Sequence, residues 1–153
     1  MTGNDKAGDL NERIRTLTEL SPVLMAVTDG EGRYQWVNRA WGQTLGYVLE
    51  DISTVSYTAL IHPEDRSIAV PRHGSKEAAT VELRHRLKGG GYVWLDWSII
   101  GAPKGDALYL VSYDITARKA LERRLDDVEQ KISNLIDNAD DVICTADLEF
   151  NFV

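Results

Sequence analysis

The side chains that could carry chemistry are few and widely spaced. Three histidines and one distant cysteine, Cys144, lack the spacing of metal ligands. The three glycines at 89–91 are not followed by Gly-Lys-Ser or Gly-Lys-Thr, and they separate two strand-like runs, so they predict a turn and not a phosphate-binding loop. Carboxylates are plentiful, but no catalytic pair is recognisable among them. We therefore predict that this segment is not an enzyme.

One histidine stands in a regular pattern. Residues 79–87 alternate in polarity, and His85 shares one face of the expected strand with Val81, Leu83 and Leu87. We predict that this apolar face points into the core. A buried imidazole is unfavourable without a hydrogen-bond partner. Two interpretations stay open: a core histidine bonded to a tyrosine or a backbone carbonyl, or a polar contact for a small ligand.

The elements that must position these residues follow from hydrophobic periodicity and turn residues. Five strands are expected, at 24–29, 33–38, 79–87, 92–100 and 107–115. Three short helical pieces are expected between the second and third strands, over 39–45, 48–52 and 57–69. Asn38 can cap the first of these helices and Gly46 can end it, while Pro63 suits a first helical turn. The pattern predicts an antiparallel sheet with a cluster of short helices.

Helical patterns flank the strands on both sides. Residues 1–20 read as a flexible lead, over 1–8, followed by an amphipathic helix. After Ile115 the apolar positions are spaced 4, 3, 4 and 3 apart, as in a coiled coil: Leu121, Leu125, Val128, Ile132 and Leu135. We predict that these five side chains form the seam of a parallel homodimer. The alternative is a helix that packs on its own sheet.

The last strand passes into this helix without an intervening glycine or proline. Asp114 or Thr116 can accept the free amides of the first helical turn. A short, capped junction would transmit a change in sheet geometry, whereas a flexible loop would dissipate it. We therefore predict a signal junction at these two residues.

An internal repeat divides the chain. Residues 17–37 and 135–153 align at a constant offset of 118, with a turn two residues shorter in the second copy. The repeat predicts one whole domain over 21–117, a connector helix over 118–139, and the truncated opening hairpin of a second domain over 140–153. We expect the chain to be part of a longer tandem protein.

Composition excludes several classes of partner. The net charge of −7 argues against nucleic acid or an anionic membrane as the main partner. A single cysteine cannot form an internal disulfide, which fits a reducing compartment. No apolar run approaches the about 18 residues that a membrane span needs. We expect a cytoplasmic location, with no membrane contact by this segment.

Several motifs, taken in order, resemble a PAS domain over roughly residues 20–118. They are Trp36-Val37-Asn38, Ala40-Trp41, Leu45-Gly46-Tyr47, Ile61-His62-Pro63-Glu64-Asp65, Tyr92-Val93-Trp94-Leu95 and Asp114-Ile115-Thr116. The resemblance implies an α+β fold, in which a five-stranded antiparallel sheet holds short helices around a pocket. It also implies a sensor or relay module of bacterial signalling proteins, such as histidine kinases of two-component systems and cyclic-dinucleotide enzymes. The output domain would lie outside this segment.

The resemblance also suggests which residues line the pocket. It places Leu95, Trp97 and Ile99 inward and Trp94 outward. The pocket candidates are Trp41, Tyr57, Val81, Leu83, His85, Leu95, Trp97 and Ile99. Two versions stay open: a relay element whose core is filled by its own side chains, or a sensor that binds a small ligand or flavin against Trp97, His85 and Trp41.

The sequence gives little support for the cofactors known in such domains. Light-sensing flavin versions use a cysteine just after the helix cluster, in an Asn-Cys-Arg-Phe-Leu-like stretch that this sequence does not contain. Haem versions use a histidine from the helical region. His62 is the nearest candidate, but its Ile-His-Pro-Glu-Asp context favours a residue that caps or orients a helix. We expect no cofactor, with flavin and haem as the alternatives.

Overall fold

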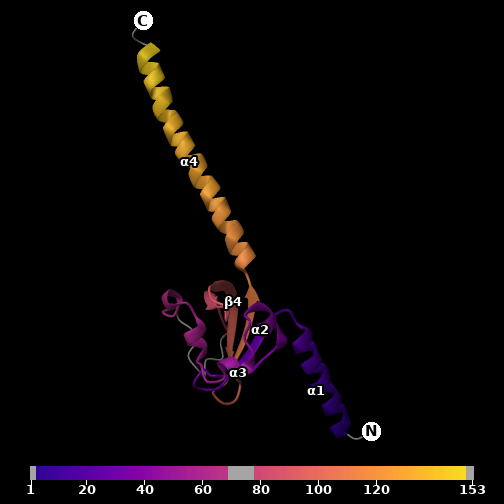
Figure 1. The fold of residues 1–153 in the computed structure, drawn as a ribbon. Helices are drawn as coiled ribbons and strands as arrows, with labels where there is room; N and C mark the ends of the chain where they lie inside the picture. Colours follow the sequence, from indigo (N-terminus) through magenta and orange to yellow (C-terminus); the bar gives the residue numbers. More distant parts are fainter. Residues whose placement is uncertain (1–2, 69–77, 151–153) are drawn as a thin grey trace. The chain divides into compact units, whose positions relative to one another are not determined.

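The structure, a computed structural model, describes residues 3–68 and 78–150 (Figure 1). The chain divides into two compact units, Met1–Thr116 and Ala117–Val153. Each unit is described by itself. The first contains the sheet and the short helices, and the described part of the second is a single long helix.

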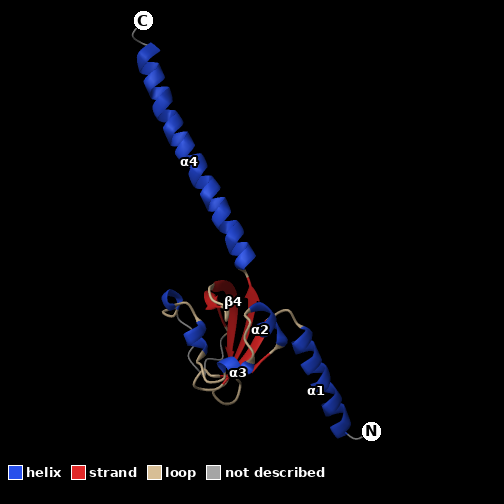
Figure 2. Ribbon diagram, in the orientation of Figure 1, coloured by secondary structure: helices blue, strands red, loops and turns tan. Residues whose placement is uncertain are grey.

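The first unit is built on a five-stranded antiparallel sheet (Figure 2). The strands are β1 (Leu24–Thr28), β2 (Tyr34–Val37), β3 (Ala79–Arg86), β4 (Tyr92–Gly101) and β5 (Leu108–Asp114). Their order in the sheet is β2-β1-β5-β4-β3, so that the two hairpins β1–β2 and β3–β4 are joined through β5. This arrangement confirms the predicted fold class.

The connection between β2 and β3 holds the expected short helices. They are α2 (Arg39–Thr44), α3 (Leu49–Ile52), η1 (Tyr57–Leu60) and η2 (Pro63–Asp65). The helical segment expected over 57–69, with His62-Pro63 starting its second half, forms two 3₁₀ turns. The residue before a proline disfavours helical backbone, and His62 is accordingly extended at ψ 138°. Residue 69 lies outside the described residues. Gly46 ends α2 with a left-handed φ of +80°, as predicted.

The core lies between one face of the sheet and the short helices. Along β4, Leu95, Trp97 and Ile99 are buried while their neighbours are more exposed. This alternation is what a strand with one face on the core requires. The predicted inward register of β4 is therefore confirmed.

The N-terminal helix α1 (Gly3–Leu20) begins earlier than expected. Residues 3–8 are helical, where the sequence suggested a flexible lead. Lys6 and Ala7 are good helix formers, and an Asp9–Arg13 ion pair of 3.0 Å between oppositely charged atoms supports the next turn. The residues before Gly3 lie outside the described part of the chain.

The second unit is formed by α4 (Thr116–Phe150), which starts at the end of the first unit. It contains the predicted connector, 118–139, but continues to Phe150. The hairpin expected from the repeat over 140–153 is wrong as far as residue 150, and residues 151–153 lie outside the described ranges. A lone two-stranded hairpin is marginal in water, whereas a continued helix satisfies its backbone hydrogen bonds within itself. In the described ranges, neither α4 nor any other helix combines the length and the apolar character of a membrane span.

Candidate functional site

The eight predicted pocket residues come together on the inner face of the sheet. Seven of them are buried, and Val81 is partly buried against the same cluster. They come from α2, η1, β3 and β4, and are Trp41, Tyr57, Val81, Leu83, His85, Leu95, Trp97 and Ile99. The eight residues thus belong to one core cluster, and their role as a ligand pocket stays a prediction.

His85 lies at the centre of this cluster and is fully buried. Its ring stacks on Trp97, with 5.5 Å between ring centroids, and meets the edge of Trp41 at 5.5 Å. Its Nδ1 atom is 3.0 Å from the carbonyl oxygen of Arg86. The predicted inward orientation and hydrogen bonding of His85 are confirmed, and of the two partners considered, a tyrosine or a backbone carbonyl, the structure shows the carbonyl. Burial lowers the pKa of His85 to about 4, so the imidazole is neutral near pH 7.

The hydrogen bond of His85 fixes its tautomer. A carbonyl oxygen only accepts, so Nδ1 carries the proton and Nε2 is left as an acceptor. That Nε2 atom is buried and has no protein partner. The tautomer therefore presents a lone pair inside the aromatic cluster.

Other buried polar atoms on the same core also lack partners. They are Thr28 Oγ1, Tyr34 Oη, Trp41 Nε1 and Trp97 Nε1. The Tyr34 ring contacts Trp41 edge-on at 4.9 Å, and Trp41 lies 6.2 Å from Trp97. Buried polar groups are normally hydrogen-bonded. Together with His85 Nε2, the cluster holds three ring-borne donors and one acceptor without a protein partner.

Tyr34 is a core residue that the sequence did not single out. It is 1% exposed, and desolvation raises the pKa of its hydroxyl well above the usual range. The strand β2 has only four residues, which is too short for alternation to decide which face is buried.

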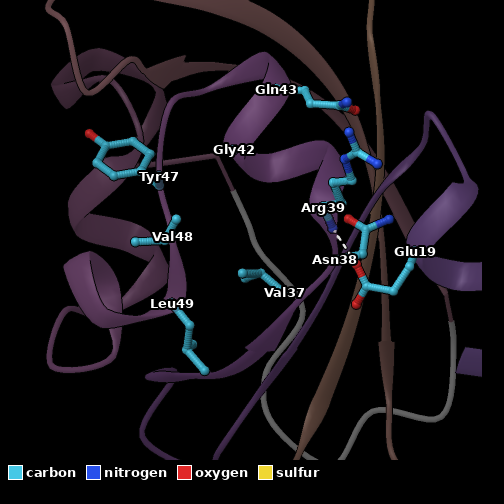
Figure 3. Close-up of a pocket in the computed structure, with 9 residues that line it drawn as sticks. All are labelled: Glu19, Val37, Asn38, Arg39, Gly42, Gln43, Tyr47, Val48 and Leu49. Atoms are coloured by element: carbon cyan, nitrogen blue, oxygen red, sulfur yellow. Dashed lines mark hydrogen bonds between the residues drawn. The ribbon is translucent and has the colours of Figure 1, made fainter.

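Two cavities between α1 and the rest of the first unit lie outside this cluster, and neither is lined by the eight residues. One lies between α1 and the outer face of β1, β2 and β5, and is lined largely by apolar side chains such as Ile14, Val27 and Trp36. The other lies where the end of α1 meets β2, α2 and α3 (Figure 3). No group of three or more metal-ligating side chains is found among the described residues.

Asn38 ties the end of α1 to the sheet beside the second cavity. It is buried, and its side-chain amide donates to the carbonyl oxygens of Thr18 and Val23, both at 2.8 Å. Its Oδ1 accepts from the Met25 amide at 3.0 Å. Asn38 holds the N-cap position of α2 as predicted, but its side chain is used elsewhere, so the expected capping hydrogen bond is absent.

Glu19 supplies the missing cap. Its Oε2 accepts from the backbone N–H of Arg39, the first residue of α2, at 3.0 Å (Figure 3). The Asn38 amide in turn satisfies a carbonyl in the last turn of α1. Glu19 of α1 thus accepts from a free amide of α2, and Asn38 at the N-cap of α2 donates to a free carbonyl of α1.

The predicted junction is ordered on the sheet side. Asp114 Oδ1 accepts from the Thr116 amide at 2.8 Å, and Thr116 Oγ1 accepts from the Trp94 amide at 3.0 Å. The Ile115 amide donates to the Trp94 carbonyl at 2.9 Å, and Ile115 is buried. The two residues named from the sequence therefore fix the start of α4 to strand β4.

His62 caps η2. Its Nδ1 accepts from the Glu64 amide at 3.3 Å, and its ring meets Tyr92 edge-on at 4.5 Å. The prediction that His62 caps or orients a helix is confirmed. Its ring is therefore already occupied by structural contacts.

Solved structures share this fold at low sequence identity. The PAS domain of an HTR-like protein from Haloarcula marismortui matches with a TM-score of 0.59 and 20% identity, covering 73% of this chain and 97% of that one. A domain of a sensory box sensor histidine kinase/response regulator from Geobacter sulfurreducens matches with 0.60 and 20%, covering 69% and 94%. The N-terminal domain of a diguanylate cyclase with PAS/PAC sensor from Marinobacter aquaeolei gives 0.54 and 16%, covering 63% and 98%. The fold is that of PAS sensor domains.

The sequence itself supports the same class. The family model described as PAS fold matches residues 34–112, and the chain belongs to this family. The chain is also 30% identical over 122 residues to the uncharacterized protein y4lL of Sinorhizobium fredii, covering 72% of this chain and 14% of that protein. It thus spans a small part of that relative's length. Domains of this family are generally sensory, non-catalytic modules.

Proposed function

We propose that this chain is a signalling module that relays a change in its sheet through a parallel dimer of α4 to a downstream output domain. The observation that carries the proposal is the apolar stripe of α4. Its side chains are between 51% and 69% exposed: Leu121, Leu125, Val128, Ile132 and Leu135. A repeat averaging 3.5 residues keeps this stripe on one side, where a second copy can cover it.

The junction supports the relay. Thr116 and Asp114 connect the first residue of α4 to β4 and β5 by hydrogen bonds, without a flexible loop. A shift of the β4 backbone at Trp94 therefore moves the start of α4. The histidine kinase and diguanylate cyclase named among the similar structures supply the type of output expected.

Light scattering of the wild type and of Leu125→Asp tests the proposal. We expect a wild-type dimer at micromolar concentration and a monomeric variant, because a charge at a buried seam position has no partner. Gln130→Asp is the matched control, since it introduces the same charge on the opposite side of the helix and should leave the dimer intact. A monomeric wild type, or a dimeric Leu125→Asp, would refute the dimeric relay.

A second candidate function is supported by the orphaned polar atoms of the core. In this version the domain is a sensor that binds a small polar ligand, or the isoalloxazine of a flavin, against Trp41, His85 and Trp97. Native mass spectrometry and the absorption spectrum of the purified protein test it. His85→Leu should then release the ligand, whereas Leu83→Met, a volume-conserving change on the same face, should retain it. A wild type whose mass equals the bare chain favours the relay version.

A further inference from the structure

The cavity beside Asn38 is a candidate binding site outside the core. Its volume is about 330 Å³, at the lower end of the range of small-molecule pockets. It is lined by Glu19 near the end of α1 and by side chains between residues 37 and 49, which cover the end of β2, α2 and the start of α3 (Figure 3). The described residues that line it belong to one compact unit.

One wall of the cavity carries hydrogen-bond donors. Arg39 and Gln43 stand four residues apart on α2, so their side chains lie on the same face of that helix (Figure 3). Among the described residues, no carboxylate forms an ion pair with the Arg39 guanidinium. A guanidinium with a neighbouring amide NH₂ is suited to bind a carboxylate.

The same wall carries one acceptor with a negative charge. Glu19 uses Oε2 to accept from the Arg39 amide, and its Oε1 has no hydrogen bond within the described part of the chain. A simple carboxylate bound at Arg39 would be repelled by this charge. A ligand that also carries an ammonium group would instead be attracted by it.

The facing side of the cavity is apolar. Val37, Val48 and Leu49 line it, and Val48 is 51% exposed despite its aliphatic side chain. Figure 3 shows these three side chains across a gap from Glu19, Arg39 and Gln43. Covering Val48 and its neighbours removes apolar surface from water.

We propose that this cavity binds a small zwitterion with an aliphatic side chain, of the size and chemistry of an apolar amino acid. The carboxylate is bound by Arg39 and Gln43, the ammonium group by Glu19, and the side chain by Val37, Val48 and Leu49. None of the residues assigned to the ligand belongs to the cluster of His85, Trp41 and Trp97 or to the stripe of α4, so the proposal does not depend on the function proposed above.

Three matched probes test the charges separately. L-Leucine has both charges, 4-methylpentanoate lacks only the ammonium group, and 3-methylbutylamine lacks only the carboxylate. In titrations followed by amide NMR shifts, we expect leucine to bind in the millimolar range, with saturable shifts at Arg39, Gly42 and Val48. Each of the other probes should bind about tenfold more weakly, since each loses a charge-assisted hydrogen bond.

Two variants assign the charges to residues. Arg39→Met should weaken leucine and 4-methylpentanoate about tenfold and leave 3-methylbutylamine unchanged. Glu19→Gln keeps an oxygen for the Arg39 amide but removes the charge, so leucine should bind more weakly and 4-methylpentanoate more tightly. Arg33→Met, an exposed arginine away from the cavity, should change none of these affinities.

The decisive result is the change in Glu19→Gln, which should bind leucine more weakly and 4-methylpentanoate more tightly than the wild type does. An absence of saturable shifts with leucine in the wild type would overturn the proposal. So would a Glu19→Gln variant that keeps the wild-type order of the probes, provided that its amide spectrum shows a folded protein. If that variant does not fold, Gln43→Leu serves in its place, because it removes one donor to the carboxylate and should weaken leucine and 4-methylpentanoate together.

Discussion

His85 is a basic side chain whose surroundings exclude its charged form. Its ring lies against two tryptophans and is fully buried, so the protonated imidazole would be desolvated without a counter-charge. The carbonyl of Arg86 compensates for only part of this loss. Protonation of His85 is therefore less favourable in the folded chain than in the unfolded chain, so it lowers the free energy of unfolding.

The stability of the first unit should depend on pH through His85. The pKa of His85 is about 4 in the folded chain and about 6.5 in the unfolded chain. Between these values the unfolded chain binds the extra proton, so the free energy of unfolding falls as the pH falls from about 6.5 towards 4. From pH 7 to pH 5 the expected loss is about 2 kcal/mol. Urea unfolding at the two pH values measures it.

His85→Leu provides the control for this pH effect. The leucine variant cannot be protonated, so the difference between pH 7 and pH 5 should shrink by most of that amount. Aspartates whose pKa is lowered, such as Asp65, contribute stability that the protein loses mainly below pH 4, so they do not account for a loss between pH 7 and pH 5. An unchanged pH dependence in His85→Leu would contradict the assignment to this residue.

Arg84 and Asp65 form an ion pair that is joined by three hydrogen bonds. Asp65 accepts from the Arg84 amide at 2.8 Å, from Nε at 3.0 Å and from Nη2 at 2.7 Å, and the hydrogen bonds of Arg84 hold the pKa of Asp65 below its usual value. Asp65 is 6% exposed, so Asp65→Ala should lower the free energy of unfolding by about 3 kcal/mol.

Glu64 gives the matched comparison for this pair. Its carboxylate also accepts from Arg84, at 2.8 Å, but its side chain is 73% exposed. Glu64→Ala should therefore change the stability by less than about 1 kcal/mol. Equal losses in chemical unfolding of Asp65→Ala and Glu64→Ala would show that burial does not decide the strength of this contact.

Single residues were predictable where a long strand gave the pattern. His85, Leu95 and Trp97 belong to strands of eight and ten residues, whose alternation groups the side chains by face. The resemblance to PAS domains then indicated which face of the second of these strands is buried. Tyr34 belongs to a four-residue strand and Glu19 acts through a contact twenty residues away, so neither role leaves a local pattern in the sequence. The second cavity leaves no local pattern either, because Glu19 on α1 and residues 37–49 form it together.

At the scale of elements, α1 is held to the sheet at its C-terminal end. Asn38 makes three hydrogen bonds there, to Thr18, Val23 and Met25, and all three partners are backbone groups. Asn38→Ala should lower the free energy of unfolding by about 2–3 kcal/mol, because buried backbone groups lose their partners. Hydrogen exchange of the last turn of α1 should rise at the same time.

Asn38→Asp and Glu19→Ala refine this prediction. The aspartate keeps the acceptor for Met25 but places a carboxylate against two carbonyl oxygens, so it should destabilise the domain at least as much as alanine. Glu19→Ala removes only the cap of α2, with an expected loss of about 1 kcal/mol. A stable Asn38→Asp variant would contradict the role given to the two amide donors.

Helix boundaries show what the sequence could not determine. The turn residues Gly46 and Pro63 were identified correctly, because proline and glycine restrict or free the backbone locally. The extent of α4 was not, because the segment after residue 139 resembles the strands of the first domain while its backbone is helical to Phe150. In that segment the repeat in the sequence and the observed secondary structure disagree.

At the scale of the whole molecule, the two units differ in how they bury their apolar side chains. The first has a core of buried side chains, whereas the apolar stripe of α4 is exposed. A helix in water gains most of its stability from packing of an amphipathic face. Under the dimer proposal, α4 acquires that packing only from a second copy.

This difference predicts two melting transitions with different dependence on protein concentration. The transition of the first unit, followed by tryptophan fluorescence from Trp41 and Trp97, should not move when the concentration is raised. The transition of α4, followed by helical circular dichroism, should rise with concentration, because association stabilises only the folded helix. Removing residues 117–153 should abolish the second transition and leave the first within about 1 °C, since an unchanged free energy of unfolding leaves the melting temperature unchanged. A helical signal that melts at the same temperature at every concentration would mean that α4 does not gain its stability from a second copy.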